Sequence, residues 1–170
     1  MFSLKRFETD SIVYELLGDS KKTPSKRTNA DADWQNLHFK RLEGNTECFY
    51  KQIGQKYFWR DRLEWSNQTW IEYVSDEKLS TYVLKDNEEI VGYFELLFYK
   101  TKAEAEIAYF GILEDYFGKK LGGYFLSQAI KKAFELDINR VWLHTCSLDH
   151  KNALKNYLSR GMVIFKSEML

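Results

Sequence analysis

The strongest constraint on the fold of this chain is the stretch of residues 79–136, where three β-rich runs precede one long amphipathic helix. The first two runs, in "LSTYVLKDNEEIVGYFELLFY", are joined by Asp86-Asn87, which is typical of a hairpin turn. The third run, "AEAEIAYFGIL" (residues 104–113 as a strand), follows a short turn around residues 100–103. It should therefore pair antiparallel with the second run.

After the third strand, apolar residues recur at helical spacing, which predicts one helix over residues 119–136. Its apolar stripe consists of Leu121, Tyr124, Phe125, Leu126, Ala129, Ile130, Ala133 and Leu136. A strand is then expected at residues 140–146, and another closes the pattern at residues 162–165.

A second helix is expected between these last two strands. Its apolar side carries Ala153, Leu154, Tyr157 and Leu158. Asp149 or Ser147 is placed to cap its start, and Gly161 stands where a glycine commonly ends a helix. The order of elements predicts an α/β fold in which helices cover one sheet.

The first part of the chain is less regular. Residues 1–33 are polar, and a basic cluster within them belongs to a plain linker or touches phosphates; it consists of Lys21, Lys22, Lys26 and Arg27. Residues 34–42 alternate between apolar and polar side chains, which predicts a first strand. Residues 45–75 predict short helices that carry Phe49, Tyr50, Tyr57, Phe58, Trp59, Trp65, Trp70 and Tyr73. These rings could stack on nucleic-acid bases, although helices packed on a sheet would give the same pattern.

Composition narrows the class of protein. With 170 residues, 44% of them hydrophobic, the chain is predicted to form one globular domain. Its 25 basic and 25 acidic residues cancel, which argues against nucleic-acid binding. Two cysteines favour a reducing cytoplasm, and neither a membrane span nor a signal-peptide pattern is found. His144 and His150 lack the spacing of a metal site, so no metal is expected.

A glycine-rich turn precedes the long helix, in the stretch "GILEDYFGKKLGGYFLSQAI". The turn contains Gly118, Lys119, Lys120, Gly122 and Gly123. A bare, positively charged backbone at a helix N-terminus binds phosphate or pyrophosphate, but glycines at such a junction also serve packing alone. The stretch is not a Walker loop, because no Ser or Thr follows the lysine. Nor is it a dinucleotide fingerprint, because the strand before it belongs to an antiparallel hairpin.

Two longer blocks, separated by one amphipathic helix, are "AEIAYFGILEDYFGKKLGGYFL" and "RVWLHTCSLDHKNALKNYLSRGM". In combination and at this spacing they resemble the GNAT superfamily of acyl-CoA-dependent N-acetyltransferases. The resemblance implies a mixed, largely antiparallel sheet with helices on both faces. It makes residues 79–165, about half of the chain, the acyl-CoA-binding core of a domain spanning residues 1–170. Residues 34–75 would then form the acceptor side, after a polar N-terminal segment at 1–33.

The resemblance places coenzyme A at the glycine-rich turn. The superfamily's phosphate loop follows the pattern Gln/Arg-x-x-Gly-x-Gly/Ala. In this chain Phe117 stands at the first position and Lys120 at that of the middle glycine. The last position of the pattern is still a glycine, Gly122. The backbone at the end of the third strand would bond the pantetheine arm and the thioester oxygen, and His150 stands where an Asn is usual. The expected cofactor-binding residues are Gly111, Ile112, Leu113, Phe117, Gly118, Lys119, Lys120, Leu121, Gly122, Gly123 and His150.

The resemblance also suggests the catalytic groups. Glu106 occupies the strand position of the general base in the histone-type branch, and Tyr157 matches the tyrosine that protonates the sulfur, in the run Ala-x-x-x-Tyr-x-x-x-Gly. If the turn pairs Lys100 with Ala103, Glu95 is a diagonal neighbour of Glu106, roughly 7–8 Å away, and one pKa of the pair would rise. From the residues alone, Glu106 could equally be a surface residue on a solvated strand face, and Tyr157 could equally be an aromatic residue of the core.

The function implied by the resemblance is transfer of an acetyl group from acetyl-CoA to an amine of a small molecule or protein by direct attack. The partners would be acetyl-CoA and an unidentified amine acceptor, and neither nucleic acid nor a membrane is expected. A homodimer is possible. Tyr57 and Trp59 are expected to line the acceptor site. The altered positions Phe117 and Lys120 keep a second interpretation open, an acyl-CoA-binding or degenerate module without turnover.

Overall fold

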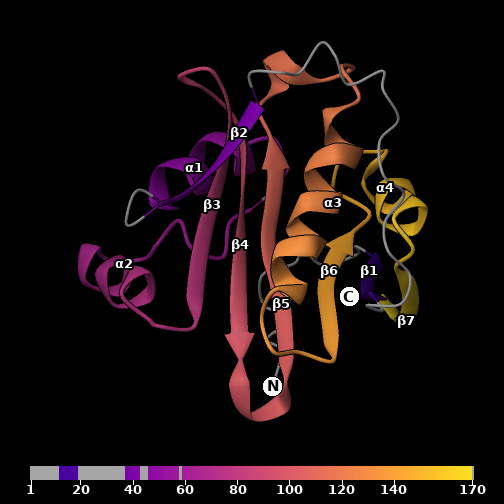
Figure 1. Cartoon of the computed structure of the whole chain (residues 1–170). Coiled ribbons are helices and arrows are strands. Elements are labelled where there is room, and N and C mark those ends of the chain that lie inside the picture. The colour runs from indigo at the N-terminus through magenta and orange to yellow at the C-terminus, as the bar shows by residue number, and fades with distance from the viewer. Residues whose placement is uncertain (1–11, 19–36, 43–45, 58, 170) are drawn as a thin grey trace.

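The computed structural model describes residues 12–18, 37–42, 46–57 and 59–169 (Figure 1). Its strands are β1 (Ile12–Gly18), β2 (Leu37–Leu42), β3 (Leu79–Asp86), β4 (Glu89–Tyr99), β5 (Glu104–Ile112), β6 (Arg140–Cys146) and β7 (Val163–Met169). Its helices are α1 (Thr46–Gly54), α2 (Asn67–Val74), α3 (Leu121–Phe134) and α4 (Ala153–Ser159), with short 3-10 turns at Lys100–Lys102 and Glu114–Tyr116. Within these residues, no helix is both long and apolar enough to cross a membrane.

All of these strands join one sheet, in the order β2-β3-β4-β5-β6-β1-β7. Every neighbouring pair is antiparallel except β5 and β6, which are parallel. The predicted mixed, largely antiparallel α/β fold is therefore confirmed. Strand β1 was not predicted, because its partners β6 and β7 lie at the other end of the sequence. The basic cluster around Lys21 and the Phe58 side chain lie outside the described residues.

Both predicted hairpins are present. Asp86 pairs with Glu89 across a turn in which Asn87 has a φ of 53°, the left-handed conformation that Asn tolerates. In the second hairpin Leu97 lies opposite Glu106, which is the predicted register.

The pairing of β4 with β5 then shifts at a bulge. Leu96 pairs with Ile107 but Glu95 pairs with Tyr109, so Ala108 is the extra residue. Ala108 and Tyr109 consequently pack on the same face of the sheet, while Phe110 returns to the opposite face. The bulge therefore turns the Tyr109 side chain toward α1.

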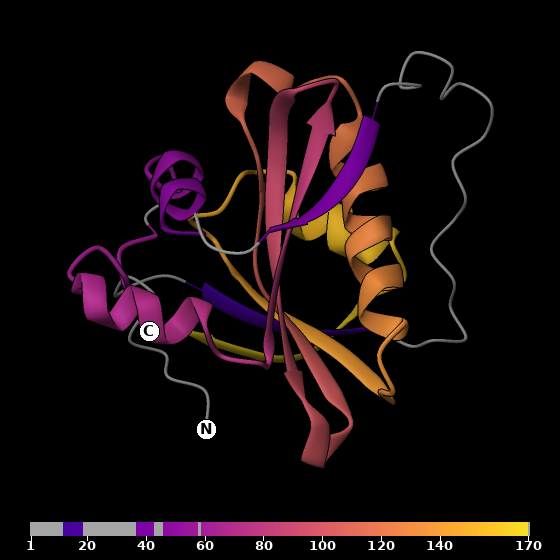
Figure 2. The same cartoon turned by 60° about the vertical axis from the view of Figure 1, so that its left-hand side comes forward.

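Helices cover both faces of the sheet (Figure 2). On one face, α3 buries the apolar stripe that was predicted for it, against strand residues such as Phe94 and Ile107. On the other face, α1 and α2 bury Phe49, Tyr50 and Trp70 against the sheet. These rings belong to the hydrophobic core and are not exposed for stacking on bases.

The start of α4 differs from the prediction. The helix begins at Ala153 after Asn152, and neither Asp149 nor Ser147 caps it. Asp149 instead accepts hydrogen bonds from Thr145 Oγ1 at 2.6 Å and from the Cys146 N–H at 3.2 Å. The carboxylate thus ties the loop after β6 to the strand, which leaves the first turn of α4 without a side-chain cap. Gly161, with a φ of 85°, ends the helix as expected.

Strands β5 and β6 stay paired over only part of their length. Pairing runs from Glu104 opposite Arg140 to Ile107 opposite Leu143 and stops there, although both strands are described further, to Ile112 and Cys146. The edge of β5 beyond Ile107 is therefore not covered by β6. This edge borders the site described next.

Candidate active site

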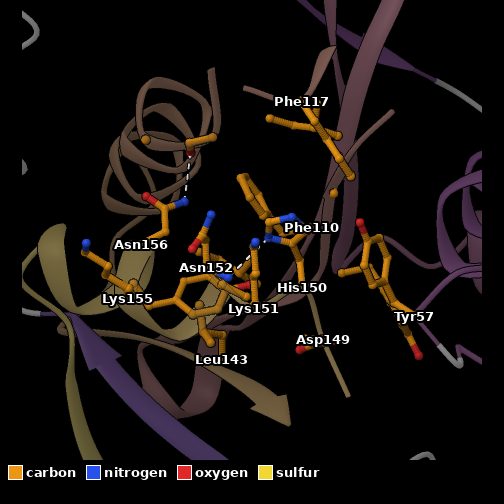
Figure 3. Close-up of a pocket in the computed structure, with 18 of the residues that line it drawn as sticks. Tyr57, Phe110, Phe117, Leu143, Asp149, His150, Lys151, Asn152, Lys155 and Asn156 are labelled. Carbon is orange, nitrogen blue, oxygen red and sulfur yellow. Dashed lines mark hydrogen bonds between the residues drawn. The ribbon is translucent and has the colours of Figure 1, made fainter. Parts of the chain in front are cut away.

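A pocket of about 600 Å³ lies where β5 and β6 stop pairing. It reaches from the turn before α3, past α4 and the loop before it, to the segment that follows α1. Figure 3 shows Phe117, His150 and Tyr57 around it, each from a different one of these segments. One cavity therefore connects the predicted cofactor side of the sheet with the predicted acceptor side.

Most of the residues predicted to bind the cofactor line this pocket. They are Gly111, Ile112, Phe117, Gly118, Lys120, Leu121, Gly122, Gly123 and His150. Leu113 and Lys119 do not line it. The Leu113 N–H already donates to the Val91 carbonyl at 2.8 Å, and the Lys119 ammonium lies 4.8 Å from the centre of the Tyr116 ring.

The turn before α3 contains two left-handed residues. Gly118 has a φ of 76°, and Lys120, directly before the helix, has a φ of 61°. Glycine adopts this conformation without strain, whereas lysine does so at a cost of roughly 1 kcal/mol. Lys120 therefore occupies, in a strained conformation, the position where the superfamily pattern has glycine. Its side chain makes no capping bond to the first N–H groups of α3.

Three further cationic residues line the pocket from the loop before α4, from α4 itself and from the residue that follows it. They are Lys151, Lys155 and Arg160. The position of α4 is fixed by Asn156, whose Nδ2 donates to the Gly122 carbonyl at 3.0 Å (Figure 3). With Lys120, these residues place positive charge around the N-terminus of α3. Such an arrangement suits an anion such as pyrophosphate.

Two of the positions that depart from the superfamily pattern, Phe117 and His150, contact each other. The rings of Phe117 and His150 lie 5.1 Å apart in an edge-to-face arrangement, and the ring of Tyr57 lies 6.2 Å from that of His150. The Asn152 N–H donates to His150 Nδ1 at 3.2 Å, which fixes the imidazole ring. The His150 ring therefore contacts aromatic rings from two distant segments at the pocket.

Tyr157 lines the pocket from α4 and is buried, with 7% of its surface exposed. Its ring packs edge-to-face against Phe110, and its hydroxyl has no hydrogen-bond partner among the described residues. Burial raises the pKa of the phenol, and the nearby Asp149 and Cys146 raise it further. The phenol therefore keeps its proton at neutral pH and can donate it to a group bound in the pocket.

Glu106 is buried beside the pocket and does not line it. The Tyr99 hydroxyl donates to Glu106 Oε2 at 3.0 Å, and His144 Nδ1 lies 4.0 Å from Glu106 Oε1. The His144 imidazole does line the pocket. The predicted base therefore does not line the pocket itself, whereas its neighbour His144 does.

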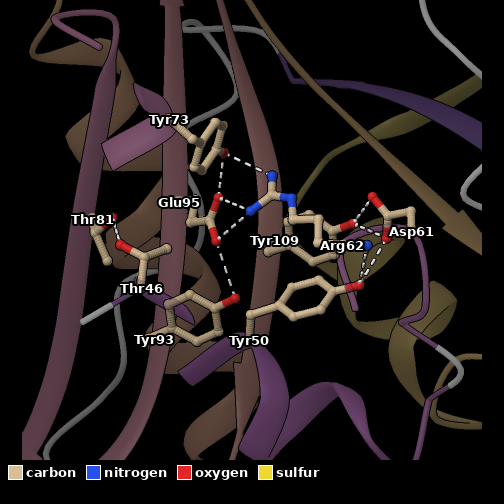
Figure 4. A network of polar contacts seen from close by, with 9 residues as sticks. All are labelled: Thr46, Tyr50, Asp61, Arg62, Tyr73, Thr81, Tyr93, Glu95 and Tyr109. Atoms are coloured by element: carbon tan, nitrogen blue, oxygen red, sulfur yellow. Dashed lines mark hydrogen bonds and ion pairs between the residues drawn. The ribbon is translucent and has the colours of Figure 1, made fainter. Parts of the chain in front are cut away.

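Glu95 does not form the expected carboxylate pair with Glu106. Arg62 Nη1 binds both of its oxygens, at 3.1 and 3.0 Å, and the hydroxyls of Tyr73 and Tyr93 donate to it at 2.5 and 3.1 Å (Figure 4). Its negative charge is balanced by a buried cation. The expectation that Glu95 and Glu106 tune each other is therefore wrong, because Arg62 balances the charge of Glu95. Nothing in the sequence indicated that Arg62 would reach Glu95.

The residue before Arg62, Asp61, lines the acceptor side of the pocket. Its carboxylate accepts hydrogen bonds from the Tyr109 hydroxyl, at 2.6 and 2.7 Å, and from the Tyr50 hydroxyl at 2.9 Å (Figure 4). Tyr57 and Trp59, expected beside the acceptor, line the same end.

The sequence model of the Acetyltransferase (GNAT) family matches residues 40–162, which include β3 to β6 and both α3 and α4. The chain belongs to the GNAT acetyltransferase family. No curated protein matches the chain.

Solved structures share the GNAT fold with this chain. A functionally unknown conserved protein from Staphylococcus epidermidis is 16% identical, with a TM-score of 0.60 over 92% of this chain and 59% of the other. A GCN5-related N-acetyltransferase from Sphaerobacter thermophilus is 14% identical, with a TM-score of 0.64 over 94% of this chain and 50% of the other. The chain thus spans about half the length of these two proteins.

A third structure is covered more completely. An aminoglycoside acetyltransferase from an uncultured soil metagenomic sample is 16% identical, with a TM-score of 0.57 over 76% of this chain and 89% of the other. At these identities the likeness concerns the fold alone.

Reasoning from the sequence of this GNAT chain missed Asp61, Lys151, Lys155 and His144 as pocket residues. Lys151 and Lys155 had a usable signal, since they are four residues apart in a block already assigned to the cofactor. Asp61 had none, because its partners Tyr50 and Tyr109 are ordinary aromatic residues in sequence.

Proposed function

We propose that this protein transfers the acetyl group of acetyl-CoA to an amine by direct attack of the amine on the thioester. The observation that supports this most strongly is the continuous pocket from the turn before α3 to Tyr157 and onward to Asp61. It provides an anion-binding end, a buried proton donor and an acceptor end in one cavity.

Coenzyme A would bind with its pyrophosphate at the backbone of residues 117–123, where the first N–H groups of α3 carry partial positive charge. Lys120, Lys151 and Lys155 would add charge around the phosphates. The pantetheine arm would follow the edge of β5 at Gly111 and Ile112, beyond the point where β6 stops covering it. Gly111 has to be glycine in any case, because a Cβ there would lie 2.3 Å from Ile53 Cγ2 of α1.

In the chemical step, the neutral amine would attack the thioester carbon, a new C–N bond would form, and the C–S bond would break. Tyr157 would give its proton to the departing thiolate. The proton lost by the acceptor nitrogen would pass to His144, with Glu106 behind it stabilising the imidazolium. In this proposal His144 is therefore the base, and Glu106, for which the resemblance implied that role, is a positioning residue that stabilises the protonated imidazole.

Calorimetric titration with acetyl-CoA, followed by release of free thiol on a panel of amines, tests this proposal. Among the described residues, Cys146 is the one thiol that lines the pocket, so it is the group that a covalent acetyl intermediate would use. Direct attack requires that Cys146→Ala keep most of the turnover. A variant that binds acetyl-CoA normally but releases no thiol would contradict direct attack.

A binding module without turnover is the second candidate, favoured by Phe117 and Lys120. The Phe117 side chain lines the pocket where the pattern has Gln or Arg, so one polar contact to phosphate is lost. Tight binding of acetyl-CoA without thiol release on any amine would support this candidate.

A further inference from the structure

We infer that the acceptor carries a positively charged group besides the amine that is acetylated, and that Asp61 binds this charge. The inference rests on the proposed function, since it concerns the acceptor end of the same pocket.

The first observation is that Asp61 is held firmly at the pocket. The next residue, Arg62, is 5% exposed and binds Glu95 of β4, and its backbone N–H donates to the Tyr50 hydroxyl at 3.2 Å. Residues 59–62 are therefore anchored to the sheet through a buried ion pair. A carboxylate on so short an anchored segment is preorganised to bind a ligand.

The second observation concerns charge. Glu95 is balanced by Arg62, but the partners of Asp61 among the described residues are two neutral phenols, Tyr50 and Tyr109. A carboxylate accepts about four hydrogen bonds, and the Tyr109 hydroxyl is shared between both oxygens. Among the described residues Asp61 therefore has no cationic partner, and it has room for a further donor. A half-buried carboxylate in this state favours a cationic ligand.

The third observation is that aromatic rings surround this end of the pocket. Tyr57, Trp59 and Tyr109 all line it, and the rings of Trp59 and Tyr109 lie 4.7 Å apart in an edge-to-face arrangement. Aromatic faces beside a carboxylate attract ammonium groups and cover their methylene chains. The opposite end of the pocket carries Lys120 and Lys155, which would repel a cation.

Two different nitrogens are required because the two sites make opposite demands. The nitrogen that attacks the thioester has to be uncharged, whereas Asp61 and the rings select a charge. Tyr109 extends from β5 to Asp61, so the carboxylate lies a tyrosine side chain away from the strand edge assigned to the thioester (Figure 4). A diamine, or a larger molecule with two separated amino groups, spans this distance and satisfies both sites.

Binding of matched acceptors to the protein saturated with coenzyme A tests the inference. A straight-chain diamine, the amino alcohol and the amino acid of equal chain length are titrated by calorimetry. We expect the diamine to bind about tenfold to hundredfold more tightly than the amino alcohol, as for a hydrogen bond to a charged group. The amino acid should bind most weakly. Added salt should weaken diamine binding and leave the amino alcohol nearly unchanged.

Two variants complete the test. Asp61→Asn should bring the diamine to within about twofold of the amino alcohol, because the charge is lost while an oxygen remains for the tyrosine hydroxyls. Glu64→Gln is the matched control, since Glu64 is exposed on the same segment and does not line the pocket, and it should keep the full preference. Equal binding of diamine and amino alcohol to the wild-type protein, or a preference unaffected by Asp61→Asn, would overturn the inference. The wild-type comparison decides the matter even if the variant fails to fold.

Thiol release on the same compounds separates this inference from the proposed function. Turnover of simple amines without a diamine preference in binding would overturn the Asp61 site and leave acetyl transfer standing. A diamine preference that Asp61→Asn abolishes, with no thiol released from acetyl-CoA, would support the cation site and contradict acetyl transfer.

Discussion

Tyr157 shows how the environment of a single residue sets its chemistry. The phenol is buried in the pocket wall, and burial raises its pKa before the nearby Asp149 and Cys146 add to the effect. A phenol in this state is a proton donor at neutral pH and a poor base. It also lacks a hydrogen-bond partner among the described residues, although buried tyrosine hydroxyls usually have one. A bound thioester sulfur would supply that partner.

Replacing Tyr157 by Phe tests whether Tyr157 acts as a general acid or only packs in the core. The ring and its packing against Phe110 are retained, and only the hydroxyl is removed. If Tyr157 protonates the thiolate, turnover should fall by about 10²–10⁴-fold. The affinity for acetyl-CoA and the melting temperature should change little. A steady-state rate within a few-fold of the wild type would assign Tyr157 to the core alone.

Replacing Glu106 by Gln tests the base. The variant should lose turnover at neutral pH, because the imidazolium of His144 would no longer face a carboxylate. Raising the pH increases the fraction of neutral amine, so the need for a base declines and the rate should partly recover. The measurement is turnover against pH for both proteins. Parallel profiles with equal rates would remove Glu106 from the mechanism.

Lys120 and Lys119 are adjacent lysines with different predicted roles. Only Lys120 lines the pocket, and only Lys120 has a left-handed backbone. Lys120→Gly should weaken coenzyme A binding by removing a charge, yet leave the melting temperature equal or higher, because glycine relieves about 1 kcal/mol of strain. Lys119→Ala removes the same charge outside the pocket and should affect affinity much less. Equal losses of affinity in the two variants would show that only the overall charge matters.

At the scale of the element, the start of α3 combines packing and binding. The Gly122 carbonyl accepts a hydrogen bond from Asn156 Nδ2 of α4, and Gly122 also lines the pocket. An ideal Cβ at this position would lie 3.5 Å from Asn156 Nδ2 and 4.0 Å from Ile112 Cδ1, which are ordinary contacts. The fold therefore tolerates a small side chain at Gly122, and the limit on larger ones comes from the ligand.

Gly122→Glu and Gly122→Ala test the position of the cofactor at this element. The glutamate would bring a negative charge and a long side chain to the predicted pyrophosphate site, so binding of coenzyme A should be abolished. The alanine variant should fold normally and bind with a modest loss. Calorimetry on both folded proteins provides the measurement. Wild-type affinity in the glutamate variant would place the pyrophosphate elsewhere.

At the scale of the whole molecule, the two faces of the sheet support different ends of the pocket. The α3 and α4 face supports the predicted cofactor end of the pocket, and the α1 and α2 face supports the acceptor end through Arg62 and Glu95 (Figure 1). Because every described strand joins this sheet, we retain the single domain of residues 1–170 as a proposal.

Removing Arg62 should destabilise the whole molecule. Arg62→Met leaves the fully buried Glu95 without its cation, and breaking a buried ion pair in this way costs about 3–5 kcal/mol. Lys51→Met removes one partner of an exposed pair with Glu47 and should cost at most about 1 kcal/mol. Urea unfolding gives the free energy of unfolding of both variants, provided that its dependence on urea concentration has the same slope as in the wild type. A small change in the Arg62 variant would mean that Glu95 finds another partner or takes up a proton.

The central elements of this fold could be predicted from the sequence because their signals are local. Turn chemistry at Asp86 and Asn87, alternation along the strands and the helical period after residue 120 each depend on neighbours within a few residues. The register of Leu97 with Glu106 followed from the length of the turn between them. The cofactor side of the site followed in the same way, since its residues are nearly continuous in sequence.

Tertiary structure alone decided which distant polar groups meet. Glu95 pairs with Arg62 and not with Glu106, and the bulge at Ala108 turns Tyr109 toward Asp61. The insertion of β1 between β6 and β7 likewise joins opposite ends of the chain. Local patterns report which side of an element is buried, but they carry no information about which buried group of another element it faces. The cofactor end of the pocket was therefore visible in the sequence, and the acceptor end became visible only when the chain was folded.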